Sequence, residues 1–357
     1  AHKTLGSSSE PYTVISRDKF DEFNELLDNG RVTVKRAKPE LEELAEITTY
    51  PLFFEDSSDL NAEHWINLAQ CIDVNYEKYD GFVILHGTDT MAYTASALSY
   101  SLQNLAKPVI FTGSQVPMSS VRSDARRNLI NSIEMATTEL QEVGICFNDH
   151  VYRGNRATKL SIGDFDAFGS PNLDPIAEIG LDIELHVPPK KLIPAFENNA
   201  AFSNEIFVLT VHPSLSMNTL DCLDLTKLKA IIVRTFGSGN FPMKGEYNMI
   251  PFFEKCRDHG VIVAIVSQAD YDAVNLTKYP AGRAALNVGA VSGGDMTMEA
   301  ALTKLMFLMA QSDSKEYNQV LSKFKSNFPN IALLENYPVK DLRLQIVYEN
   351  GQYRMLG

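Results

Sequence analysis

Paired cysteines are missing from this 357-residue sequence. Its four cysteines are Cys71, Cys146, Cys222 and Cys256, and no two have the Cys-x-x-Cys spacing of zinc sites and redox motifs. Cys71 and Cys146 lie in apolar stretches, where we expect them to be buried as small hydrophobic residues. The pattern suggests neither a zinc knuckle nor a disulfide framework, so we expect a reducing compartment, the cytoplasm.

Long apolar runs are also missing. No segment approaches the roughly 20 apolar residues of a membrane-spanning helix, and the N-terminus lacks the apolar core of a signal peptide. Positive charge is scarce as well, since 32 Lys and Arg stand against 45 Asp and Glu, a net charge of −13. An interspersed acidic excess disfavours nucleic acids and anionic membranes as partners, but it does not repel a small zwitterion.

The composition that remains is that of a globular protein with more than one core. Hydrophobic residues make up 45% and charged residues 22% of the chain, and the length suits two α/β domains. In the first half, apolar runs typical of buried strands alternate with segments of helical period. The expected strands are 81–85, 108–112 and 144–147, and the expected helices are 60–79, 91–104 and 124–138. This alternation predicts a larger N-terminal domain with a doubly wound parallel sheet.

The same alternation returns in the second half of the chain. The expected strands are 206–211, 230–234 and 261–266, and the expected helices are 247–259 and 297–311. Between the halves, residues 187–204 are rich in Pro, Asn and Lys and have no regular period. We therefore expect an N-terminal domain over 1–188, a linker over 189–204 and a smaller C-terminal α/β domain over 205–357.

Polar segments follow the apolar runs of the first domain. The segments 86–90 (HGTDT) and 113–115 (GSQ) come directly after expected strands, 152–159 (YRGNRATK) is reached after the strand 144–147, and 56–59 (DSSD) follows the apolar residues 52–54. Ligands bind at the carboxyl ends of the strands in an open parallel sheet. Hydroxyl, carboxylate and ammonium groups are therefore expected to meet on one rim of this sheet.

Thr88, Asp89 and Lys159 are the candidates for chemistry on that rim. A hydroxyl beside a lysine and an aspartate can be activated as a nucleophile, or it can activate a water molecule. Lys159 would accept or relay the proton if burial favours its neutral form, and Asp89 would orient the ammonium group.

The threonines of the HGTDT segment also have a plainer explanation. Thr88 and Thr90 could cap a helix that begins near Met91, where the helix dipole would favour Asp89. Taken alone, this explanation is the commoner one, because Ser, Thr and Asp are the residues that helix starts select.

The other candidates have structural alternatives too. Lys159 alone could be a solvated surface charge, and Ser57-Ser58 could be an ordinary turn. His86 could be a core histidine, and we assign it no chemical role. The SGGD segment at 292–295 could bind an anion at a helix start, but it lacks the full phosphate-loop pattern.

Six segments taken together point to one family. In chain order they are 56–59 (DSSD), 86–92 (HGTDTMA), 112–117 (TGSQVP), 153–159 (RGNRATK), 235–240 (TFGSGN) and 293–297 (GGDMT). Each resembles a motif of the L-asparaginases of the bacterial type I and animal cytosolic kind. Six colinear motifs are far more specific than any one of them, and the resemblance extends over roughly residues 10–312.

The resemblance implies hydrolysis of L-asparagine to L-aspartate and ammonia without a metal or organic cofactor. It implies that Thr88, Asp89 and Lys159 are catalytic. It also implies that Ser57 binds the α-carboxylate of the substrate, with help from its loop, and that Asp89 binds the substrate ammonium. The substrate-binding residues implied in this way are Asp56, Ser57, Ser58, Thr88 and Asp89.

The resemblance further implies an assembly in which subunits share their sites. The family forms dimers or tetramers in which the second domain of one subunit completes the site of its partner. Asn240 and Tyr279 match positions that would reach across. We expect a homodimer or homotetramer with small-molecule substrate and no nucleic-acid or membrane partner.

One motif of the family does not appear. Its first threonine follows a strand and stands in Thr-Gly-Gly-Thr, whereas this chain begins with AHKTLG, in which His2-Lys3 replaces the two glycines of the tight turn. We expect the missing strand to lie upstream of Ala1, and we do not assign Thr4 as the nucleophile. The alternative is a catalytically silent amino-acid-binding protein of the same fold.

Overall fold

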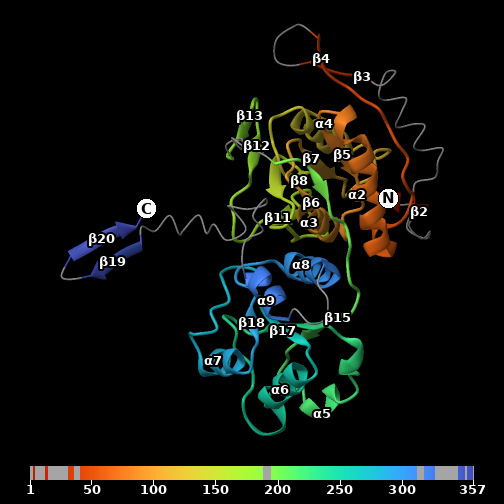
Figure 1. Ribbon diagram of the computed structural model, residues 1–357. Coiled ribbons are helices and arrows are strands. Elements are labelled where there is room, and N and C mark those ends of the chain that lie inside the picture. The colour runs from red at the N-terminus through yellow and green to blue at the C-terminus, as the bar shows by residue number, and fades with distance from the viewer. Residues whose placement is uncertain are drawn as a thin grey trace.

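The strands of this protein gather into two main sheets, one in each half of the chain (Figure 1). The computed structural model describes residues 3–4, 13–14, 31–35, 41–187, 194–311, 317–325, 345–349 and 352–356. Among these residues no helix is both long and apolar enough to cross a bilayer.

The first sheet has six strands in the order β13-β12-β9-β8-β7-β5. Their bounds are Phe82–Leu85 (β5), Val109–Thr112 (β7), Val143–Phe147 (β8), His150–Arg153 (β9), Ala177–Ile179 (β12) and Ile183–Leu185 (β13). The three strands expected from the sequence, β5, β7 and β8, pair in parallel, as predicted.

The other edge of this sheet is antiparallel, which the sequence did not predict. β9 pairs with β8 in register Phe147↔His150, so only Asn148 and Asp149 connect the two strands. Asn148 takes a positive φ of 58°. Two residues suffice for a hairpin turn, whereas a parallel pair needs a crossover of a dozen residues or more, so β9 has to run antiparallel.

Three helices cover the first sheet, and they form where the apolar spacing predicts them. They are Ala62–Asn75 (α2), Met91–Ser101 (α3) and Ala125–Ala136 (α4). α2 begins at a capping box between Asn61 and His64 and turns an apolar stripe that includes Trp65 and Leu68 toward the core. α3 is buried almost all round. The burial of α3 matters for the site because its first turn follows the HGTDT segment.

The second sheet has four parallel strands in the order β15-β16-β17-β18. Its strands are Ile206–Thr210 (β15), Ala230–Thr235 (β16), Ile262–Ser267 (β17) and Val291–Ser292 (β18). The helices of this half are Met217–Leu220 (α5), Ile250–Asp258 (α6), Pro280–Asn287 (α7), Met298–Gln311 (α8) and Tyr317–Lys325 (α9). One core cluster includes residues of α6 and α7, and another includes residues of α8 and α9, so the second domain is an α/β layered domain like the first.

Three helices, α2, α3 and α6, begin or end at least three residues inside their predicted ranges, and α3 does so by ending at Ser101. α6 starts at Ile250, after the 3-10 helix Gly245–Tyr247 (η5), because Pro251 lacks an amide hydrogen and fits only the first helical turn. α2 ends at Asn75 and continues as the 3-10 helix Tyr76–Lys78 (η3).

The two halves meet along α8 and α3, which Figure 1 shows at the boundary between the upper and lower layers. Met306 of α8 belongs to the core cluster of the first domain. Residues 188–193 of the expected linker region lie outside the described residues. Further along, Glu197–Asn198 (β14) pairs with Leu102–Gln103 (β6), which holds this part of the chain against the end of α3.

The remaining strands form small two-stranded sheets. They are Lys3–Thr4 (β1), Thr13–Val14 (β2), Arg31–Lys35 (β3), Leu41–Glu46 (β4), Thr158–Lys159 (β10), Phe168–Gly169 (β11), Gln345–Glu349 (β19) and Gln352–Leu356 (β20). Of the N-terminal residues in which the first threonine motif was sought, only Lys3–Thr4 are described, and they pair with β2. The strand that matters for the site is β10, because it carries Lys159.

Candidate active site

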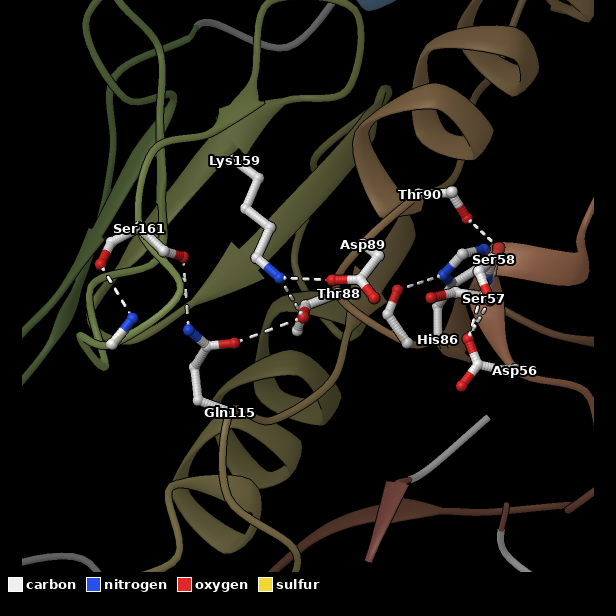
Figure 2. Close-up of polar contacts among 12 residues, drawn as sticks. Asp56, Ser57, Ser58, His86, Thr88, Asp89, Thr90, Gln115, Lys159 and Ser161 are labelled. Carbon is white, nitrogen blue, oxygen red and sulfur yellow. Dashed lines mark hydrogen bonds and ion pairs between the residues drawn. The ribbon is translucent and has the colours of Figure 1, made fainter. Parts of the chain in front are cut away.

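Lys159 joins the two candidates that follow β5. Its Nζ donates one hydrogen bond to Thr88 Oγ1 at 2.8 Å and another to Asp89 Oδ1 at 2.8 Å (Figure 2). The side chain of Lys159 is only 16% exposed. The explanation of Lys159 as a solvated surface charge is therefore wrong, because its ammonium group bridges a hydroxyl and a carboxylate on the predicted rim.

Gln115 contacts Thr88 from the other side, as Figure 2 shows. Thr88 Oγ1 donates to Gln115 Oε1 at 3.3 Å, while Gln115 Nε2 donates to the carbonyl oxygens of Ser161 and Asp164 at 3.4 and 3.1 Å. Carbonyl oxygens accept but cannot donate, so these two contacts fix which end of the Gln115 amide faces Thr88. Gln115 was expected after a strand end, but it was not among the predicted site residues.

The helix-cap explanation of the threonines is also wrong. Thr90 stands at the N-cap position of α3, yet its side chain makes no capping hydrogen bond. Its Oγ1 donates instead to the carbonyl oxygen of Ser57 at 2.6 Å. The hydroxyl of Thr90 thus ties the DSSD loop to the HGTDT segment, and the hydroxyl of Thr88 bonds to Lys159 and Gln115.

The DSSD loop forms the 3-10 turn Ser57–Asp59 (η2), so the turn expected at Ser57-Ser58 is present. Asp56 Oδ1 accepts from the backbone N–H of Ser58 at 2.9 Å and from Ser58 Oγ at 2.7 Å. Ser57 is buried, with 3% of its surface exposed. Asp56 and Ser58 therefore stabilise the shape of the loop, and Ser57 lies against the HGTDT segment.

His86 is a core histidine, as one explanation of the sequence had it. It is buried, its Nδ1 lies 2.7 Å from the carbonyl oxygen of Gly87, and its Nε2 lies 2.9 Å from Thr94 Oγ1. Because a carbonyl can only accept, Nδ1 carries a proton. Burial lowers the pKa of His86 to about 4, so the ring is neutral at pH 7 and links the turn to α3.

Asn240 and Tyr279 lie in the second domain, and both are exposed. Asn240 follows β16 at the end of a turn in which Gly237 and Gly239 have φ values of 45° and 95°. A Cβ on Gly239 would lie 2.6 Å from Leu276, so this turn requires glycine. Within the described residues, no hydrogen bond joins Asn240 or Tyr279 to Thr88, Asp89 or Lys159. The chain thus brings together the first-domain residues of the predicted site but not these two.

The described part of the chain holds no group of three or more His, Cys, Asp or Glu side chains that could ligate a metal ion. The atoms gathered around Thr88 are a hydroxyl, an ammonium, a carboxylate and an amide. Such a set can activate a hydroxyl or a water molecule by proton transfer and can bind a small zwitterion.

Comparison with known proteins matches both halves of the chain. Residues 21–191 match the family described as "Asparaginase, N-terminal", and residues 205–321 match "Glutaminase/Asparaginase C-terminal domain". L-asparaginase 1 of Escherichia coli (strain K12) is 40% identical over 293 residues, which cover 80% of this chain and 85% of that protein.

Solved structures agree with these sequence matches. L-asparaginase I from Vibrio cholerae has a TM-score of 0.76 and 36% identity, over 93% of this chain and 97% of that chain. The thermostable L-asparaginase from Thermococcus kodakarensis has a TM-score of 0.80 and 27% identity, over 93% and 96% of the two chains. Matched in both domains and in the order of its motifs, the chain belongs to the asparaginase family.

Proposed function

We propose that this protein hydrolyses the side-chain amide of L-asparagine, giving L-aspartate and ammonia, and that Thr88, Lys159 and Asp89 carry out the reaction. The observation behind these roles is the pair of 2.8 Å contacts from Lys159 Nζ to Thr88 Oγ1 and Asp89 Oδ1. Membership of the asparaginase family favours hydrolysis over the alternative of a catalytically silent amino-acid-binding protein. No metal or organic cofactor has a role in this proposal.

In the proposed reaction Lys159 first accepts a proton and later gives it back. Lys159 in its neutral form takes the proton of Thr88 Oγ1, and the oxygen either attacks the amide carbon or deprotonates a water molecule that attacks it. The C–N bond then breaks, and Lys159 returns the proton to the nitrogen, which leaves as ammonia. If Thr88 attacks directly, water hydrolyses the resulting ester and aspartate is released.

In this proposal the loop at 56–58 and Asp89 bind the substrate. We propose that Ser57, held by the turn that Asp56 and Ser58 stabilise, binds the α-carboxylate of asparagine. Asp89, whose side chain is 49% exposed, would bind the α-ammonium. Figure 2 supports this division, because Asp89 lies between Lys159 and the DSSD loop.

We also propose a homodimer or homotetramer in which Asn240 and Tyr279 of one subunit complete the site of its neighbour. Exposed apolar side chains follow Lys159 in the chain, and a second subunit would cover them. They are Leu160, Ile162 and Phe165. A two-fold arrangement would bring two such surfaces to two reciprocal sites.

The remaining features of the proposal concern the whole chain. We assign residues 1–188 to the N-terminal domain, 189–204 to the linker and 205–357 to the C-terminal domain. We propose the cytoplasm as the location of the protein. Its net charge of −13 disfavours nucleic acids and anionic membranes as partners.

Release of ammonia from millimolar L-asparagine by the full chain tests the reaction. Thr88→Val should lower kcat by at least about a thousandfold with the fold intact, since it removes the hydroxyl and keeps the shape. Thr137→Val is the matched control, because the exposed Thr137 bonds only its own helix at Glu134 O. Absence of ammonia with the unmodified chain would overturn the reaction, and an active Thr88→Val protein would overturn the role of Thr88.

A further inference from the structure

The segment 153–159 contacts both domains through successive side chains. Arg153 pairs with Glu142 inside the first domain. Arg156 crosses to the second domain, where its two terminal nitrogens donate to the two carboxylate oxygens of Asp295 at 3.0 and 2.5 Å. The side chains of Arg156 and Asp295 are 2% and 14% exposed. The two side chains form a buried bidentate ion pair. The carboxylate of Asp295, paired with the Arg156 guanidinium, lies in the SGGD segment, and this disfavours the anion-binding explanation of that segment.

Thr158 makes the second crossing. Its Oγ1 donates to Glu299 Oε1 at 2.8 Å, and Glu299 lies in the first turn of α8. Glu299 is only 9% exposed, and burial raises the pKa of its carboxyl group. Thr158 is therefore bonded to a buried acid on the helix that packs against α3.

Lys159 directly follows Thr158 in the strand β10. Successive side chains of a strand point to opposite faces. Thr158 accordingly contacts the second domain, whereas Lys159 reaches Thr88 and Asp89 in the first. Any shift of the Thr158 backbone moves the amine of Lys159 as well.

We infer that the two domain-crossing contacts, Arg156–Asp295 and Thr158–Glu299, position Lys159 for proton transfer. We call these two contacts the latch. Thr158, Glu299, Arg156 and Asp295 are then positioning residues, and the second domain of the same chain controls the geometry of the first-domain site. The inference rests on the proposed role of Lys159 as the proton carrier.

Plain adhesion between the domains is the competing explanation, and the chain offers a matched control for it. Ser96 Oγ and Thr303 Oγ1 lie 2.8 Å apart, both buried, and also join the two domains. This contact lies on α3 and α8, one turn of α8 after Glu299, and it involves no residue of β10. Ser96→Ala therefore removes a domain-crossing hydrogen bond of the same kind without touching the strand that carries Lys159.

The test compares kcat and KM for asparagine among Thr158→Val, Thr158→Ser and Ser96→Ala in the full chain. A displaced reacting group costs turnover rather than affinity, so Thr158→Val should lower kcat by about ten- to a hundredfold and leave KM within about twofold. Thr158→Ser keeps the donor and should restore kcat. Ser96→Ala should keep the kcat of the unmodified protein even if its melting temperature falls as far as that of Thr158→Val.

A second route reaches the same contact from the other domain. Glu299→Leu removes the acceptor of the Thr158 hydroxyl and keeps a side chain of similar size, so it breaks the same hydrogen bond from the other side. It should lower kcat as Thr158→Val does, in a protein whose melting temperature shows that it is folded. Unchanged kcat in a folded Glu299→Leu protein would overturn the inference.

The Lys159→Met background separates this inference from the proposed function. If the latch acts through Lys159, adding Thr158→Val to Lys159→Met causes no further loss of kcat. A Lys159→Met protein with normal kcat would overturn both the role of Lys159 and the latch. An inactive Lys159→Met protein, together with Thr158→Val behaving like Ser96→Ala, would overturn the latch alone.

Discussion

The predicted site residues of the two domains differ in what they contact. On the first sheet, Thr88 and Asp89 are bonded to Lys159, which the rest of the chain holds in place. On the second, Asn240 and Tyr279 face solvent after β16 and at the start of α7. The rule that ligands bind at the carboxyl ends of parallel strands predicted the first-sheet residues. Asn240 and Tyr279 were expected only from the resemblance to the asparaginases.

This difference separates residues that act within a chain from residues that act between chains. The partly buried side chains of the first-sheet site bond one another inside the chain, as Lys159, Thr88 and Gln115 do. The exposed Asn240 amide and the exposed Tyr279 phenol are accessible to a neighbouring subunit, as the proposed shared site requires.

The largest effect is expected from mixing two defective chains. Thr88→Val removes the first-sheet hydroxyl, and Asn240→Ala should lower kcat by about a hundredfold if Asn240 completes the site of its partner. In a mixed dimer one site carries both changes and the other carries neither. A one-to-one mixture, co-expressed, should therefore recover about a quarter of the normal activity, from half of the dimers with half of their sites.

Mixing Thr88→Val with Lys159→Met is the control for that experiment. Both changes lie on the first sheet, so every site of a mixed dimer keeps one defect and activity should stay low. If Thr88→Val mixed with Asn240→Ala recovers no more activity than this control, the sites are built within single chains and the comparison between the two sheets fails.

The next effect concerns acid and the buried His86 beneath the first-sheet turn. Its pKa of about 4 in the folded protein lies below the usual 6.5, so the unfolded chain binds the proton first as the pH falls. The stabilisation is present above pH 6.5 and is lost as the pH falls toward 4, by about 3 kcal/mol. Urea unfolding from pH 7 to pH 4 should show this extra loss in the unmodified protein relative to His86→Asn.

His259→Asn serves as the control, since His259 is exposed and bonds Lys255 O of its own helix. It should lose stability with pH in parallel with the unmodified protein. A His86→Asn protein that also follows the unmodified curve would show that protonation of His86 does not set the acid limit of the first domain.

The smallest of the three effects concerns Gln115. Its amide accepts from Thr88 and holds the backbone at Ser161 and Asp164, so Gln115→Leu should lower kcat by about ten- to a hundredfold. Steady-state kinetics against Gln311→Leu checks this, because Gln311 also donates to a backbone carbonyl, that of Asn199, but elsewhere. Equal kcat in both variants would mean that the Thr88 hydroxyl needs no partner besides Lys159.

Much of this architecture was open to prediction from local pattern. The apolar runs at 81–85, 108–112 and 144–147 became the parallel strands β5, β7 and β8. The polar segments after them carry the cluster around Lys159. These features depend on short-range spacing and on the direction in which parallel strands end, which the order of residues already contains.

The order of residues was enough to specify the alternation of strands and helices, the two-domain plan and the family, because apolar period and colinear motifs are local or ordered features. The partner that each polar side chain bonds follows only from the packed fold. Thr90 bonds Ser57 instead of capping its helix, and Arg156 meets Asp295 from 139 positions away. Hydrogen bonds and ion pairs act over about 3 Å in space and are indifferent to separation along the chain, so their partners appear only once the core has packed.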